Sequence, residues 1–99
     1  MSEPIRFEKE MAETRESLAR GLMRLLGPRG ESIARGEMQL EIGEGEKRLV
    51  LEIADLPARK FGPVDLPALK VTATLTGYGP GEAEAFKRDF ERIFQRGGG

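Results

Sequence analysis

The sequence contains neither histidine nor cysteine among its 99 residues. Histidine is the side chain that ordinarily titrates near neutral pH, and cysteine is the usual thiolate nucleophile and soft-metal ligand. Their absence excludes Ser-His-Asp and Cys-His catalytic sites, zinc fingers, haem and iron–sulfur ligation, and CxxC redox pairs. A chain without cysteine is also compatible with a reducing compartment such as the cytoplasm.

The sequence also lacks an excess of either charge and any long apolar run. Sixteen Lys and Arg residues nearly balance seventeen Asp and Glu residues, for a formal net charge of −1. Binding to a phosphate backbone depends on clustered excess cations, so we expect no nucleic-acid partner. No stretch approaches the roughly 18 apolar residues of a membrane span, and residues 1–10 do not resemble a secretory signal. We therefore expect a cytoplasmic protein with no membrane partner.

What is present is the composition of a small globular chain. Hydrophobic residues make up 38% of the sequence and charged residues 33%, which is polar but not typical of disorder. The length fits one domain with a single modest core, so residues 1–99 are predicted to form one domain.

Two amphipathic helices are predicted. Residues 7–26 carry an apolar stripe at helical spacing that ends at Gly27-Pro28, and it comprises Phe7, Met11, Leu18, Leu22 and Leu25. Gly21 lies inside this helix and costs about 1 kcal/mol relative to alanine. A second helix over residues 80–96 begins with Pro80 at its first position, before a flexible glycine tail at residues 97–99. Its stripe comprises Ala83, Phe86, Phe90, Ile93 and Phe94.

Three strands are predicted at residues 37–42, 47–54 and 70–76, where apolar and polar residues alternate with a period of two. Each is apolar on one side only, as in an antiparallel sheet with one open face. The predicted fold is therefore an α+β two-layer sandwich in the order α-β-β-β-α, with two helices on one face of a three-stranded antiparallel sheet. The open face would carry Gln39, Glu41, Arg48, Glu52, Lys70, Thr72, Thr74 and Thr76, a second candidate interaction surface.

The connection over residues 54–69 is long and contains three prolines. Long loops are often functional, and Arg59, Lys60 and Phe61 form a cation-and-aromatic group suited to binding another protein. Alternatively, Phe61 packs inward with Val64 and Leu66 as a small satellite cluster, which leaves the two cations in solvent.

The chain ends in Arg96-Gly97-Gly98-Gly99. A Gly-Gly carboxylate after an arginine resembles the tails of ubiquitin-like modifiers and sulfur carriers. The resemblance implies adenylation followed by conjugation or thiocarboxylation at this tail, with Gly98 and Gly99 as the functional residues. It covers only the last few residues, and in those families a strand rather than a helix precedes the tail. The other interpretation is a helix stop followed by a frayed end.

No combination of residues indicates catalysis. Asp55 and Asp65 are the nearest approach to a carboxylate pair, but aspartate is common in turns. We therefore predict no catalytic residue, no metal site and no cofactor. The predicted function is a small non-catalytic accessory or protein-interaction domain, with a ubiquitin-like or sulfur-carrier protein as the alternative.

Overall fold

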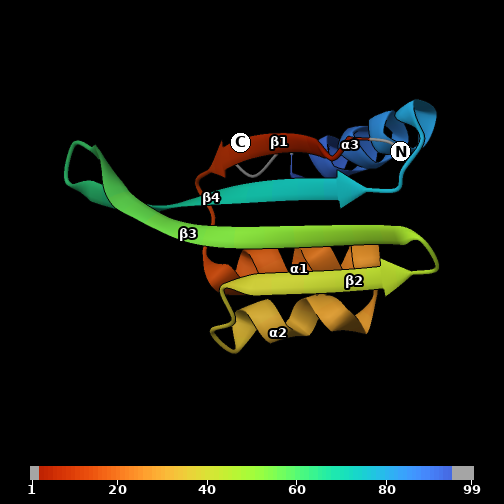
Figure 1. The fold of residues 1–99 in the computed structure, drawn as a ribbon. Coiled ribbons are helices and arrows are strands. Elements are labelled where there is room, and N and C mark those ends of the chain that lie inside the picture. The colour runs from red at the N-terminus through yellow and green to blue at the C-terminus, as the bar shows by residue number, and fades with distance from the viewer. Residues whose placement is uncertain (1–2, 95–99) are drawn as a thin grey trace.

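A computed structural model of the chain describes residues 3–94. These residues form a four-stranded antiparallel sheet in the order β1-β4-β3-β2, together with three α-helices (Figure 1). The elements are β1 (Ile5–Met11), α1 (Arg15–Leu26), a 3₁₀ turn (Pro28–Gly30), α2 (Glu31–Ala34), β2 (Gln39–Glu44), β3 (Lys47–Phe61), β4 (Val64–Thr76) and α3 (Pro80–Phe94). The predicted α+β class is confirmed, but the sheet has one strand more and the chain one helix more than predicted.

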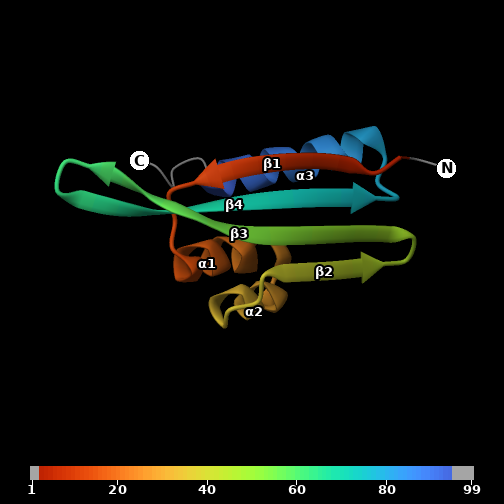
Figure 2. The same ribbon diagram turned by 60° about the vertical axis from the view of Figure 1, so that its left-hand side comes forward.

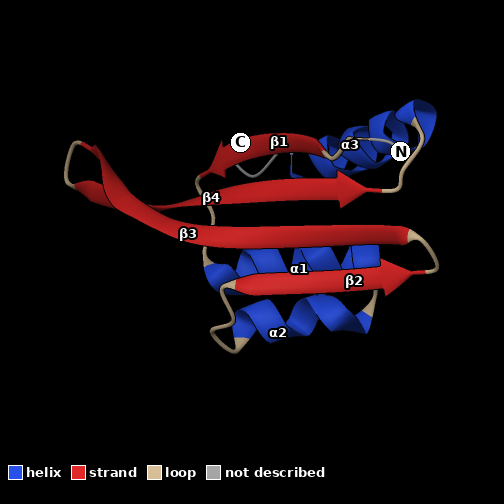
Figure 3. Cartoon of the chain, in the orientation of Figure 1, coloured by secondary structure: helices blue, strands red, loops and turns tan. Residues whose placement is uncertain are grey.

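The helices lie on one face of the sheet and leave the other face bare (Figure 3). A single apolar cluster joins the two layers: Leu18 and Leu22 from α1 and Phe90 from α3 pack on Leu51 and Val71 of the sheet, and all five are 1% exposed or less. No helix within residues 3–94 has the length and apolarity needed to cross a membrane.

The predicted helix over residues 7–26 is wrong in its first half. Residues 5–11 instead form the edge strand β1, in which Phe7 lies opposite Ala73 of β4. Phe7 and Met11 are four residues apart, a spacing that satisfies both a helical period and a period of two. Helix α1 begins only after Thr14, whose hydroxyl accepts a hydrogen bond from the Ser17 N–H at 3.1 Å, and such a cap ends the strand connection and starts the helix.

The hydrogen bonds of the sheet alternate along each strand. Ile53 of β3 donates its N–H to the carbonyl of Met38 next to β2 at 2.8 Å. Successive residues of an antiparallel strand bond to opposite neighbours, so the odd-numbered residues of β3 bond to β2 and the even-numbered ones to β4. Glu52 of β3 lies opposite Thr72 of β4, so even-numbered residues of these two strands bond to each other. The odd-numbered residues of β4 therefore bond to β1.

The two helices α1 and α3 touch at Gly21. A Cβ atom built at this position would lie 2.5 Å from Cζ of Phe94 and 3.1 Å from Cγ2 of Ile93. Gly21 is thus the close-contact residue between the helices, which accounts for a glycine in a helix interior.

The start of α3 is tied to the β2–β3 turn through Glu82. Its carboxylate accepts hydrogen bonds from the ammonium group of Lys47 and, at 3.0 Å, from the N–H of Gly79. The Lys47 hydrogen bond is the main cause that lowers the pKa of Glu82, and the same contact raises the pKa of Lys47. The pair connects the first turn of α3 to the start of β3.

Candidate functional site

The segment predicted as a loop over residues 54–69 is a pair of strands. Strands β3 and β4 remain paired beyond the ends of both their neighbours, since β1 reaches only to Leu69 of β4 and β2 only to Glu52 of β3. The resulting two-stranded projection, here called the arm (residues 57–67), extends past the body of the molecule (Figures 1 and 2). It contributes to a longest dimension of 50 Å, against 24 and 20 Å in the other directions.

A β-bulge allows Pro57 and Pro67 to lie within two paired strands. The register shifts between Leu56 and Arg59, so that Pro57 and Ala58 on β3 lie opposite the single residue Pro67 on β4. Proline cannot donate a hydrogen bond to a neighbouring strand and is tolerated at bulges and on edges. The sequence predicts this proline-rich stretch as a long connection, and the bulge explains how it forms paired strands instead.

The arm closes in a two-residue turn, Gly62-Pro63, between the paired residues Phe61 and Val64. Gly62 has a φ of 58°. A positive φ at the first central position is what a type II′ hairpin turn requires, and this turn matches the twist of the flanking strands.

One face of the arm is apolar and exposed. Opposed residues share a face, so Phe61 and Val64 at the tip lie with Leu66 and Arg59 below them; we call these four residues the arm face. Phe61 is 67% exposed and Val64 52% exposed. The alternative in which Phe61, Val64 and Leu66 form an inward cluster is therefore wrong, because Phe61 and Val64 are exposed and only Leu66 is half-buried.

The two cations of the predicted group have different surroundings. Arg59 donates to Oε1 of Glu10 at 3.1 Å and so ties the arm back to β1. Lys60 lies on the opposite face of the arm, across from Asp65, and takes part in no ion pair within residues 3–94. The predicted group therefore divides between two faces, with Phe61 and Arg59 on one and Lys60 on the other.

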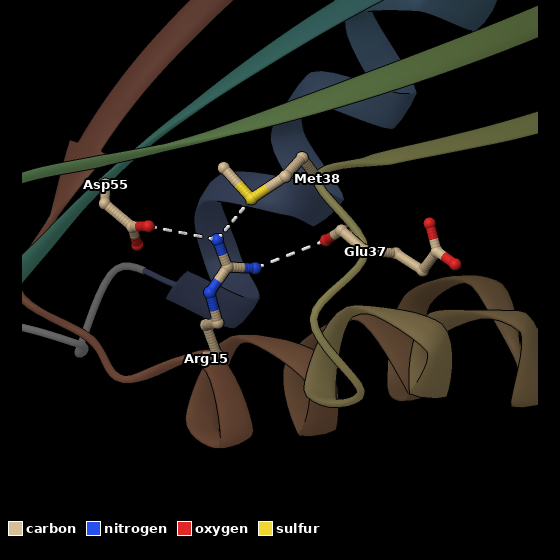
Figure 4. A network of polar contacts seen from close by, with 4 residues as sticks. All are labelled: Arg15, Glu37, Met38 and Asp55. Atoms are coloured by element: carbon tan, nitrogen blue, oxygen red, sulfur yellow. Dashed lines mark hydrogen bonds and ion pairs between the residues drawn. The ribbon is translucent and has the colours of Figure 1, made fainter.

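The base of the arm is held by Arg15, the first residue of α1 (Figure 4). Its guanidinium donates to the carbonyl of Glu37 and to the carboxylate of Asp55, each at 3.2 Å, and contacts the sulfur of Met38. The Arg15 side chain is only 22% exposed. One side chain thus joins the start of α1, the segment before β2, and β3 just before the bulge.

The bare sheet face carries charges that largely neutralise each other. Glu8 lies 3.8 Å from Lys70 and 3.9 Å from Arg6, and Arg48 lies 3.3 Å from Glu41. The register places the polar residues predicted for this face on it. A shallow hollow of about 350 Å³ lies near its centre, and its lining includes Gln39, Glu52 and Thr72. Because several of its charges already have partners, this face is a weaker candidate than the arm.

The structure does not bring Asp55 and Asp65 together. Asp55 lies at the base of the arm in contact with Arg15, whereas Asp65 lies next to the tip, so they do not form a carboxylate pair. Within residues 3–94 no group of three acidic side chains is placed to hold a metal ion.

Gly98 and Gly99 lie outside the described residues. The element that leads toward them is the helix α3, which departs from the strand that the carrier resemblance implies.

The sequence groups Phe61 with Val64 and Leu66, but as an inward cluster and not as an exposed surface. Only the pairing of the strands shows that these three side chains share one face of the arm. The signal was present in Gly62-Pro63 between Phe61 and Val64, since a two-residue loop with glycine first is typical of a hairpin.

Comparisons with protein-family models, with curated proteins and with solved structures found no match to this chain.

Proposed function

We propose that this chain is a small non-catalytic accessory protein of the cytoplasm that binds another protein through the arm. The observation that carries the proposal is the exposure of Phe61 and Val64 as a facing pair at the tip. Exposed apolar groups gathered on one surface are typical of protein-binding sites. Phenylalanine and arginine are also among the residue types enriched in protein–protein interfaces.

The shape of the arm supports insertion into a partner. Its side chains are exposed except for the half-buried Leu66, so they contribute little to the core of this chain. The bulge and the two-residue turn set the register of the two strands, which places Phe61 and Val64 side by side at the tip. The partner that fits is a protein with an apolar pocket for Phe61 and Val64, and with acidic groups at its rim for Lys60 and Arg59.

Site-specific photocrosslinking tests the proposal. Phe61 is replaced by benzoylphenylalanine in the native cell, and the matched control carries the same replacement at Met23, which is 39% exposed on α1. A defined crosslinked protein at position 61 and none at position 23 is the expected result. Once that protein is purified, Phe61→Ala with Val64→Ala should weaken its binding by about 1 kcal/mol or more, that is, fivefold or more. Equal crosslinking at both positions would contradict a role for the arm.

Arg59 needs a separate control because it also holds the arm against β1. The single variant Arg59→Glu loses both its contact with Glu10 and any contact with a partner, whereas the double variant with Glu10→Arg restores an internal ion pair of reversed sign. If Arg59 contacts the partner, binding stays weak in the double variant. If Arg59 only positions the arm, the double variant recovers binding.

The carrier hypothesis stays as the second candidate, based on the sequence of the tail alone. It predicts that one residue added after Gly99 abolishes function while the fold is retained. Intact-mass analysis of the chain from its native cell measures it directly, since thiocarboxylation replaces a terminal oxygen by sulfur and conjugation adds the mass of a second molecule. An unmodified chain that still crosslinks at position 61 favours the arm.

A further inference from the structure

Within residues 3–94, strand β1 has no partner strand on one side of its backbone. It pairs with β4 on one side only and is the last strand of the sheet on the other. Continuing the hydrogen-bond alternation across β4, the odd-numbered residues of β1 bond to β4. The even-numbered residues Arg6, Glu8 and Glu10 therefore direct their N–H and C=O groups to the open edge. Such an edge is a template for one more strand.

A groove runs along this edge between β1 and one side of α3. At its first end, a hollow of about 180 Å³ is lined by Ile5 and Phe7 from the strand and by Pro80 and Ala83 from the helix, together with charged side chains. Phe7 packs against Phe90 with ring centroids 5.6 Å apart, so the floor of this half is apolar and in contact with the core.

The second half of the groove is basic. A hollow of about 460 Å³ is lined by Lys9 from β1 and by Arg88, Glu91 and Arg92 from α3. None of these three cations takes part in an ion pair within the described residues. A chain of net charge −1 thus concentrates unpaired positive charge beside an open strand edge.

We propose that this groove binds an extended segment of another protein, which adds to β1 as a fifth strand. Phe7 and Lys9 lie two residues apart on the groove side of β1, so the two side chains opposite them are also two residues apart. The ligand is then a segment with a large apolar residue opposite Phe7 and an Asp or Glu opposite Lys9. Backbone hydrogen bonds supply affinity, and these two side chains supply selectivity.

The charges favour this occupant over two others. A lysine on the inward side of an edge strand discourages indiscriminate strand pairing, so Lys9 admits a strand only when a carboxylate faces it. A second copy pairing through β1 brings no carboxylate to this position on the groove side, since the groove-side residues of β1 are Ile5, Phe7, Lys9 and Met11. A nucleic-acid backbone is disfavoured because Glu91 stands between Arg88 and Arg92.

The probe is a synthetic nonapeptide of alternating threonine and apolar residues, with phenylalanine and glutamate two positions apart. Titrated into the ¹⁵N-labelled full chain, it should shift the amide signals of β1 and α3. It should also slow the hydrogen exchange of the Arg6, Glu8 and Glu10 amides. A peptide with lysine in place of the glutamate should bind about tenfold more weakly, and Lys9→Glu should reverse that preference. The matched control Arg24→Glu, on the exposed side of α1, should leave the preference for the glutamate peptide unchanged.

Three results would overturn the proposal. The first is no binding of the probe at millimolar concentration by a chain that is folded. The second is equal binding of a probe that is N-methylated at the residues alternating with its phenylalanine and glutamate, because those N–H groups face β1 and strand addition requires them. The third is protection of the edge amides by raising the protein concentration alone, which would assign the edge to self-association. Removal of the arm should leave probe binding intact, so this test is independent of the proposed function of the arm.

Discussion

Excision of the arm tests whether it serves binding rather than folding. Residues 57–67 are replaced by the dipeptide Asn-Gly. This dipeptide then connects Leu56 to Ala68, which are the last regular pair before the bulge. Both residues have even numbers and therefore form a hydrogen-bonded pair, the geometry that a two-residue type I′ turn closes. The shortened hairpin thus keeps the natural register of β3 and β4.

The magnitude follows from what the excised residues contact. The ion pair between Arg59 and Glu10 is about half exposed on both sides and contributes about 0.2–1 kcal/mol. The three cross-strand pairs of the arm contribute about 0.2–1 kcal/mol each. These gains are offset by the entropy of ordering the arm, since an isolated two-stranded hairpin is only marginally stable. The free energy of unfolding should therefore change by no more than about 1 kcal/mol.

Urea denaturation followed by circular dichroism measures this change. The comparison variant is Phe90→Ala, whose side chain is fully buried against Phe7 and Phe94 and whose truncation should cost about 3–5 kcal/mol. A loss of more than 3 kcal/mol on excision, or loss of cooperative unfolding, would refute the reasoning and make the arm part of the folding core. A stable chain that no longer engages its partner would separate folding from binding.

Three further predictions concern the body of the molecule. Gly21→Ala should lower the free energy of unfolding by about 1 kcal/mol, because overpacking against Phe94 costs about 1–3 kcal/mol and the gain in helix propensity returns about 1; urea denaturation showing a more stable variant would contradict the close contact. Arg15→Ala should cost about 1 kcal/mol by the same assay and speed the hydrogen exchange of amides at the base of the arm. Glu82→Gln should remove two pH effects on the thermal midpoint. In the parent, the lowered pKa of Glu82 contributes stability that is present above pH 4.5 and is lost as the pH falls through the lowered pKa. The raised pKa of Lys47 contributes stability that is present below pH 10.5 and is lost as the pH rises through the raised pKa. Identical pH profiles for parent and variant would show that the pair does not form in solution.

Several elements could be predicted because their signals are local. Helix α1 ends directly before Gly27-Pro28, because glycine suits the position after a helix and proline cannot continue it. Helix α3 begins at Pro80, because proline is favoured at the first position of a helix. The alternation over residues 70–76 lies within β4 and predicts which face is buried. The absence of histidine and cysteine excludes whole classes of chemistry whatever the fold.

Long-range pairing decided the rest. Residues 5–11 become a strand because β4 offers partners 58 to 70 positions away in the sequence, and no periodicity within the segment contains that information. The arm exists because a bulge across two strands accommodates Pro57 opposite Pro67, whereas each proline taken alone argues for a loop. The arm face and the groove beside β1 likewise gather residues that are distant in the sequence. Local propensity is set by neighbours in the chain, but surfaces are set by neighbours in space, and only the tertiary structure determines those.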